Sequence, residues 1–207
     1  INICILGEAN KNRVFTRTGA RPGDQVFVTG TLGDSAMGLQ LLKSRDKKFK
    51  STKHKRSLIQ KHLVPIPRVK ESSLLAKSKL QITSMIDLSD GLVQDLGHLL
   101  STAKLGAEIH EANLPISKAL KSIYQQKESA LTNWALKGGE DYELLFTIRR
   151  EDVKKLNKLF LKADTTVSHI GEITKSPGKI FLRQKNGRKK SLKSSIGFNH
   201  FKRDKWS

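Results

Sequence analysis

The sequence predicts an α+β fold, a mixed β-sheet layered with helices. Short runs rich in β-branched and aromatic residues alternate irregularly with segments whose apolar residues recur at helical spacing. No internal repeat is apparent. The 207 residues are enough to bury a substantial core, and they fit one large domain or one domain plus a fragment.

The first third of the chain predicts two strands and one helix. Strands are expected over 1–6 and 25–31, and a turn cluster rich in glycine and proline precedes the second. A helix should follow, with Asp34 or Ser35 as its N-cap. Residues 43–61 carry nine Lys or Arg, which indicates a solvated loop or the polar side of a short helix.

The rest of the chain continues the irregular alternation of helices and strands. Spacing of apolar residues predicts helices over 68–79, 91–104, 117–126 and 151–161. Alternating or continuous apolar runs predict strands over 81–88, 106–112, 142–148, 167–173 and 179–184, before a basic tail.

The charge balance is strongly basic and limits the classes of partner. The chain has 39 Lys and Arg against 19 Asp and Glu, a formal net charge of +20, which favours nucleic acid, anionic membrane or phosphorylated small molecules. Cys4 is the only cysteine, so internal disulfides and Cys-rich zinc sites are excluded. No apolar run approaches the roughly 18 residues of a membrane span, so a cytoplasmic protein is expected.

One acid-rich junction stands out in this basic chain. In SMIDLSDGLVQDLGHLL, a strand is followed by a helix at Asp87, Ser89 and Asp90, and the stretch contains a third acid, Asp95. The N–H groups of such a helix terminus favour phosphate, and two carboxylates can hold Mg²⁺. A purely structural role is the alternative interpretation: Ser89 would cap the helix and Asp90 would lie in its first turn. Helix caps are far commoner in proteins than metal sites.

Two further segments combine glycines with charged residues. In ALKGGEDYELLFTI, two glycines and the acids Glu140 and Asp141 precede the strongest apolar strand, where backbone can approach a ligand closely. In TRTGARPGDQVFVTG, Arg17 and Arg21 flank glycines and could clamp phosphate. The alternative interpretation is an ordinary Gly-Gly turn for the first segment and a basic hairpin for the second.

Taken together and in this order, these segments resemble the thiamine-monophosphate kinase family. The resemblance lies in TRTGARPGDQVFVTGTLGDSAMGL, MIDLSDGLVQDLGHLL and ALKGGEDYELLFT, with LVPIPR and the closing IGFNHF also in agreement. That family belongs to the aminoimidazole-ribonucleotide-synthetase-like superfamily of ATP-dependent enzymes. The resemblance therefore implies the C-terminal α+β domain of that fold.

The implied reaction is Mg²⁺-assisted, ATP-dependent phosphorylation of thiamine monophosphate to thiamine diphosphate. By the resemblance, Asp87 and Asp90 would bind Mg²⁺, and Asp95 and Asp141 would have supporting roles. No dedicated catalytic base is implied, because the substrate phosphate is already ionised and phosphoryl transfer depends on positioning and charge neutralisation.

The resemblance also implies how the two substrates are held. Arg17 and Ser89 would contact ATP. Glu140 would hold thiamine monophosphate, and Phe198 would lie against its ring system. The acids would thus bring in a cation that draws two anionic substrates together.

The family pattern implies a domain boundary. Residues 1–20 would be the terminal strand or strands of a largely missing N-terminal ATP-binding domain, and 21–207 the C-terminal domain. A homodimer through that N-terminal domain is expected.

Two other functions remain open from the sequence. A nucleic-acid-binding basic module is suggested by the basic clusters at 43–61 and 183–193, although aromatics are only 6% and few stacking residues accompany those clusters. A related ATP-dependent enzyme of the same superfamily with another small substrate is the second alternative. The motifs favour the kinase, without nucleic-acid or membrane partners.

Overall fold

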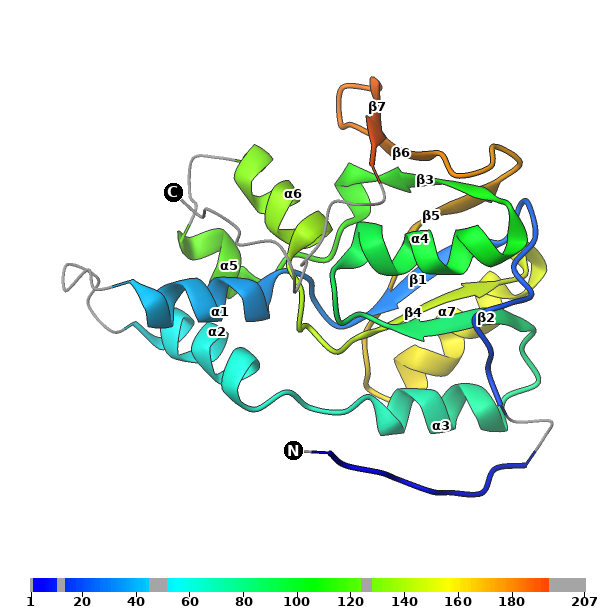
Figure 1. Cartoon of the computed structure of the whole chain (residues 1–207), viewed down its shortest axis with the longest axis horizontal. Helices are drawn as coiled ribbons and strands as arrows, with labels where there is room; N and C mark the ends of the chain where they lie inside the picture. The colour runs from blue at the N-terminus through cyan, green and yellow to red at the C-terminus, as the bar shows by residue number, and fades with distance from the viewer. Residues whose placement is uncertain (1, 11–13, 45–51, 124–127, 194–207) are drawn as a thin grey trace.

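The computed structural model of the chain describes residues 2–10, 14–44, 52–123 and 128–193. Its centre is a seven-stranded sheet in the order β2-β4-β1-β5-β3-β6-β7, antiparallel throughout except where β3 pairs with β6 (Figure 1). This mixed sheet confirms the predicted α+β class. The strands are β1 (Gln25–Thr29), β2 (Ile82–Asp87), β3 (Gly106–His110), β4 (Leu144–Ile148), β5 (Val167–Thr174), β6 (Ile180–Arg183) and β7 (Lys189–Leu192).

Helices surround this sheet and also gather beside it. They are α1 (Asp34–Lys43), α2 (Lys53–Leu63), α3 (Val69–Lys77), α4 (Leu92–Ala103), α5 (Lys118–Ile123), α6 (Glu128–Lys137) and α7 (Val153–Lys162). Two short 3-10 turns, η2 (Glu111–Asn113) and η3 (Arg150–Asp152), complete the described elements.

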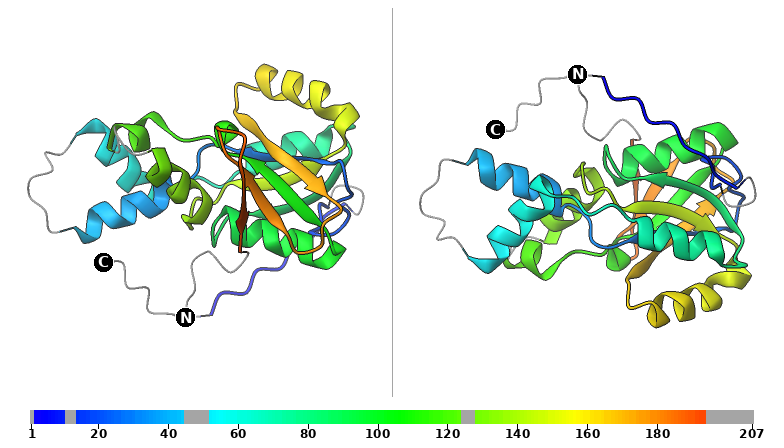
Figure 2. Two further views of the ribbon diagram at one scale, coloured as in Figure 1. Left: turned by 90° about the horizontal axis from the view of Figure 1, so that it is seen from above. Right: turned by 90° about the horizontal axis from the view of Figure 1, so that it is seen from below.

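The sheet is apolar on both faces, because side chains alternate along each strand. On β1, Val26 and Val28 pack with α4 on one face, whereas Phe27 packs with α3 and α7 on the other. Views from above and below show the sheet between these helices (Figure 2). Each such fully buried side chain contributes roughly 1.5–3 kcal/mol of burial free energy, so the two-sided packing is the main support of the sheet.

Four helices form a separate group beside the sheet (Figure 1). Met37 of α1, Leu58 of α2, Leu120 of α5 and Leu131 of α6 share one apolar cluster. The loop after β1 leads into this group at α1, and the loop before β4 leaves it from α6. The acidic motifs lie in that loop before β4 and in the loop between β2 and α4.

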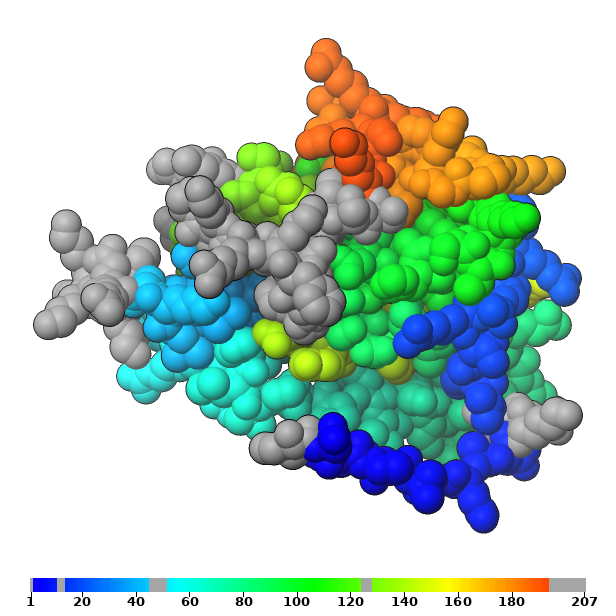
Figure 3. All heavy atoms as spheres, in the orientation of Figure 1, coloured from blue at the N-terminus to red at the C-terminus, as the bar shows by residue number. Residues whose placement is uncertain are grey.

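The strand predicted over 1–6 does not form in the described part, since residues 2–10 have no regular structure. Ile3, Ile5 and Leu6 are 82%, 86% and 92% exposed. A strand needs a neighbour for its backbone hydrogen bonds, and none of the described strands pairs with this segment. Figure 3 shows the segment running along the outside of the molecule.

Three further details differ from the sequence prediction. The N-cap of α1 is Gly33, with a left-handed backbone, rather than Asp34 or Ser35. The basic stretch 43–61 contains much of a true amphipathic helix, α2, which buries Leu58; residues 45–51 lie outside the described part. Helix α6 and strand β7 were not predicted.

None of the described helices combines the length and apolarity that crossing a membrane requires.

Candidate functional site

The two acidic motifs, far apart in the sequence, lie side by side. The backbone N–H of Glu140 donates to the carbonyl oxygen of Ser89 (2.7 Å), and that of Tyr142 donates to Leu88 (2.9 Å). In return, the N–H of Leu88 donates to the carbonyl oxygen of Glu143 (2.8 Å). Three backbone hydrogen bonds therefore fix the loop after β2 against the loop before β4.

Glycine allows this close approach at two positions. Gly91 has φ 117°, and a Cβ there would lie 2.9 Å from the carbonyl oxygen of Lys137. A Cβ on Gly139 would lie 2.7 Å from the carbonyl oxygen of Ser89. Larger residues would force the two loops apart, so the glycines of both motifs have a packing function.

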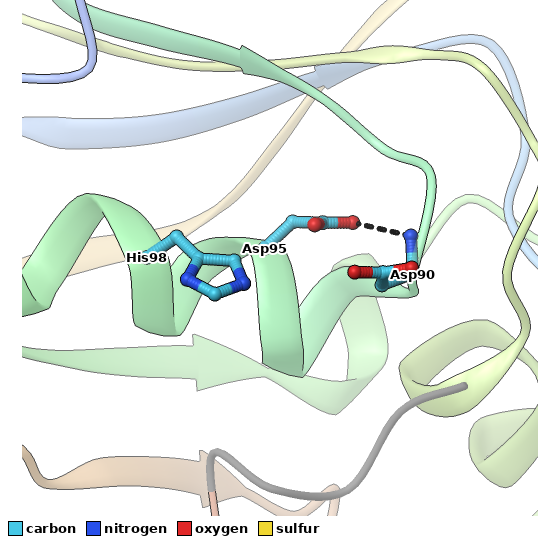
Figure 4. Close-up of side chains that lie close together, drawn as sticks. All are labelled: Asp90, Asp95 and His98. Atoms are coloured by element: carbon cyan, nitrogen blue, oxygen red, sulfur yellow. Dashed lines mark hydrogen bonds between the residues drawn. The ribbon is translucent and has the colours of Figure 1, made fainter. Parts of the chain in front are cut away.

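Asp95 holds the loop after β2 in place. One oxygen of its carboxylate accepts the N–H groups of Ser89, Asp90 and Gly91 at 3.0, 3.0 and 3.1 Å, and the bond from Asp90 is drawn in Figure 4. Burial raises the pKa of Asp95 above its ordinary value, and these N–H donors oppose that rise.

This arrangement corrects one sequence expectation. Ser89 does not cap α4, because the N-cap is Gly91 and no side chain bonds there. The three N–H groups that Asp95 binds belong to Ser89, Asp90 and Gly91, immediately before the first helical residue. The N–H groups of this loop are therefore already paired with a carboxylate.

The two predicted metal ligands lie on either side of Ser89. Asp87 is exposed at the end of β2, and Asp90 is half-buried and accepts the side-chain amide of Gln94 at 3.0 Å. Ligand atoms of Asp90, Asp95 and His98 lie within 4.8 Å of one another (Figure 4). One oxygen of Asp95 already accepts three backbone N–H groups, and Asp90 accepts Gln94, so two members of this trio are engaged in protein hydrogen bonds.

The loop before β4 is strained at two residues. Glu140 has φ 62° and Tyr142 has φ 50°, a left-handed conformation that costs roughly 1–3 kcal/mol for each residue other than glycine. Both are exposed, while Asp141 between them is buried. The alternation turns Glu140 outward and Asp141 inward.

Asp141 links this loop to the start of α1. Its two carboxylate oxygens accept the N–H of Gly33 at 2.6 Å and the N–H of Ser35 at 3.1 Å. Burial raises its pKa from 3.8 to about 7, against the lowering effect of those two donors. Asp141 thus acts as the hydrogen-bond acceptor for N–H groups at the N-terminus of α1.

Glu143 is a fully buried carboxylate that the sequence interpretation missed. It accepts Thr29 Oγ1 at 2.7 Å, and its other oxygen accepts Lys61 Nζ at 3.2 Å and Arg68 Nη2 at 2.5 Å. A Cβ on Gly30 would collide with this carboxylate at 2.1 Å. The sequence did contain a signal, because Glu143 is the one acid in the apolar run YELLFTI. A carboxylate buried in such a strand needs a cationic partner from another part of the chain.

Arg17 is exposed in the segment that runs beside β2, where the carbonyl oxygen of the preceding Thr16 accepts the N–H of Met85 at 2.9 Å. Phe198 lies outside the described residues. The structure therefore brings Ser89, with Asp87 and Asp90 on either side of it, against Glu140.

Comparisons with known proteins agree with this arrangement. Residues 21–183 match the family described as AIR synthase related protein, C-terminal domain. The chain is 41% identical over 201 residues to a thiamine-monophosphate kinase of Buchnera aphidicola subsp. Schizaphis graminum, covering 97% of this chain and 60% of that protein. It is 45% identical over 167 residues to the thiamine-monophosphate kinase of Escherichia coli K12, covering 81% of this chain and 47% of that protein.

A solved structure described as AaThiL complexed with AMPPCP and TMP superposes with a TM-score of 0.72 at 35% identity, over 90% of this chain and 54% of that one. The chain thus spans at most 60% of the length of these three proteins. It belongs to the AIR synthase related protein family, whose C-terminal domain it carries, and its curated relatives are thiamine-monophosphate kinases.

Proposed function

We propose that this protein phosphorylates thiamine monophosphate with ATP to give thiamine diphosphate. The observation that carries the proposal is the hydrogen-bonded contact between the Asp87–Asp90 loop and the loop containing Glu140. This contact joins residues proposed for the metal and nucleotide to a residue proposed for the acceptor. The named activity of the relatives, and the AMPPCP and TMP in the description of one solved neighbour, support the same reaction.

The residues present suit Mg²⁺. Asp87 is exposed and Asp90 is half-buried on the same loop, and Mg²⁺ commonly takes one or two carboxylates together with water and phosphate oxygens. When bound, the ion would offset the negative charge of the phosphates. Asp87 and Asp90 would hold it, and Asp95 keeps their loop in one conformation through three backbone hydrogen bonds.

The substrates would be oriented by side chains around that loop. Ser89 and the exposed Arg17 would contact ATP, with the guanidinium binding phosphate oxygens. Glu140 would attract the positively charged ring system of thiamine monophosphate, and Phe198 would stack on it. With both anions held in line, the acceptor phosphate oxygen can attack the terminal phosphorus of ATP without a dedicated base, as the bond from that phosphorus to the bridging oxygen breaks and ADP leaves.

The direct test is thiamine diphosphate formation by the protein as its source makes it. Its intact mass is measured first, because a species heavier than 23.2 kDa and extended at the N-terminus would include the proposed ATP-binding, dimer-forming domain. Asp87→Asn should abolish turnover without lowering the melting temperature, since Asp87 is exposed. A large fall in melting temperature would instead make Asp87 a structural residue.

Phe198→Ala separates the two substrates. We expect this variant to bind thiamine monophosphate more weakly by about tenfold, the loss of roughly 1.4 kcal/mol of ring contact, while Mg·ATP binding is unchanged. Titration calorimetry with each ligand measures both affinities. An equal loss for the two ligands would contradict the assignment of Phe198 and favour a related enzyme with another substrate.

A further inference from the structure

We propose that His62 is a positioning residue, which orients the carboxylate of Glu140 and so determines the affinity for the acceptor substrate. The inference rests on the function proposed above and adds a residue to its acceptor side. It is carried by the contact between α2 and the loop before β4.

The imidazole of His62 lies between two polar partners. Its Nδ1 is 3.4 Å from Oε2 of Glu140 and 3.1 Å from Oγ of Ser35. The side chain of His62 is 16% exposed, whereas that of Glu140 is 48% exposed. Because a carboxylate only accepts hydrogen bonds, the contact is favourable when Nδ1 carries the proton. The ring would then hold one oxygen of Glu140 and leave the other toward solvent.

The packing of α1 on α2 explains how His62 reaches Glu140. A Cβ on Gly38 would lie 2.2 Å from the carbonyl oxygen of Leu58 and 3.0 Å from Cβ of His62. Only glycine at this position lets the two helices approach so closely. The sequence therefore brings the last turn of α2, where His62 lies, against the start of α1 and the loop beside it.

A closed set of contacts connects His62 to both acids of the motif. Asp141 accepts the backbone N–H of Ser35, the hydroxyl of Ser35 contacts His62, and His62 contacts Glu140, the neighbour of Asp141. Glu140 has a left-handed backbone with φ 62°, which requires support from its surroundings. The set fixes this loop both through its backbone and through its exposed carboxylate.

A spectroscopic test examines the contact without any substrate. The ring-nitrogen ¹⁵N resonances of His62 report which nitrogen carries the proton. We expect a protonated Nδ1 in the unsubstituted protein, and a shift of that resonance in Glu140→Gln. A proton on Nε2 alone, with no change in Glu140→Gln, would overturn the inference.

A kinetic test examines the consequence for the substrate, using the protein in its native full-length form. His62→Ala should raise the KM for thiamine monophosphate by about tenfold, as expected when a charged substrate-binding group loses the contact that orients it, and leave the KM for Mg·ATP unchanged. His62→Gln should recover part of the loss, because its amide can still donate. His54→Ala, at an exposed position on the same helix, is the matched control and should change neither value.

The outcomes distinguish the inference from the function on which it rests. An unchanged KM for thiamine monophosphate in His62→Ala, or an equal rise for Mg·ATP, would overturn the role of His62 while the kinase remains. If the unsubstituted protein neither binds nor converts thiamine monophosphate, the proposed function fails. The ring-nitrogen spectrum then decides by itself whether His62 orients Glu140.

Discussion

The buried carboxyl group of Asp141 should make the stability of the protein fall as pH rises. Its pKa is raised from 3.8 to about 7 in the folded protein, mainly by burial. Below pH 3.8 the group is neutral in both the folded and the unfolded state. Between pH 4 and 7 the unfolded chain releases a proton that the folded protein keeps, so the stability contributed by the neutral form is lost progressively.

The magnitude follows from the two pKa values. At 1.36 kcal/mol for each pKa unit, a rise from 3.8 to about 7 corresponds to about 4 kcal/mol, an order-of-magnitude figure. Other acids also have shifted pKa values: burial raises the pKa of Asp95, and for Glu108 hydrogen bonds from Lys189 and Arg183 outweigh the raising effect of burial and lower the pKa. Asp141→Asn cannot ionise, so a comparison with this variant isolates the pH-dependent part of the contribution of Asp141.

The assay is urea unfolding of both proteins between pH 4 and 8. We expect the free energy of unfolding of the unsubstituted protein, relative to that of Asp141→Asn, to fall by about 4 kcal/mol between pH 4 and pH 8. The loss of one acceptor oxygen in Asn adds an offset that does not change with pH. A difference that stays constant across this range would refute the reasoning. It would mean that the N–H groups of Gly33 and Ser35 fully offset the cost of burying the charge.

Two further substitutions test the packing around the site. Gly91→Ala should lower the free energy of unfolding by about 1–3 kcal/mol because of its backbone conformation. Gly7→Ala, with open space around it, should have no effect, and equal effects would contradict the packing argument. Glu143→Gln should cost about 3–5 kcal/mol by removing the buried charge that faces both Arg68 and Lys61, measured by urea unfolding. A loss no larger than that of the exposed Glu151→Gln would show that the buried pair adds nothing.

The sequence predicted the elements with clear periodicity. Strands β2 and β4 were predicted from their apolar runs. The structure explains these runs, because adjacent residues such as Leu145 and Phe146 pack on opposite faces of the sheet. Helix α7 was predicted from a single apolar stripe that includes Leu156 and Phe160. In contrast, β7 exposes three of its four residues at the end of the sheet, and α6 has only a short stripe.

The site was only partly predictable for a different reason. The motifs indicated which acids belong together, but the roles of Asp95 and Asp141 depend on backbone groups. Asp141 binds the N–H of Gly33, which is 108 positions away in the sequence. Asp95 binds three N–H groups of the loop just before it, a geometry that no side-chain pattern specifies. Backbone hydrogen bonds, long-range for Asp141 and local for Asp95, decided these roles.

The central position of β1 has a consequence for synthesis on the ribosome. Gln25 pairs with Ile148 on one side and with Glu172 on the other, so neither neighbour of β1 exists when that strand emerges. At about 5–20 residues per second, translation takes on the order of ten seconds to deliver both partners. During that interval the apolar segment QVFVT keeps two unpaired edges, which leaves it open to pairing with other exposed strands until β5 has been made.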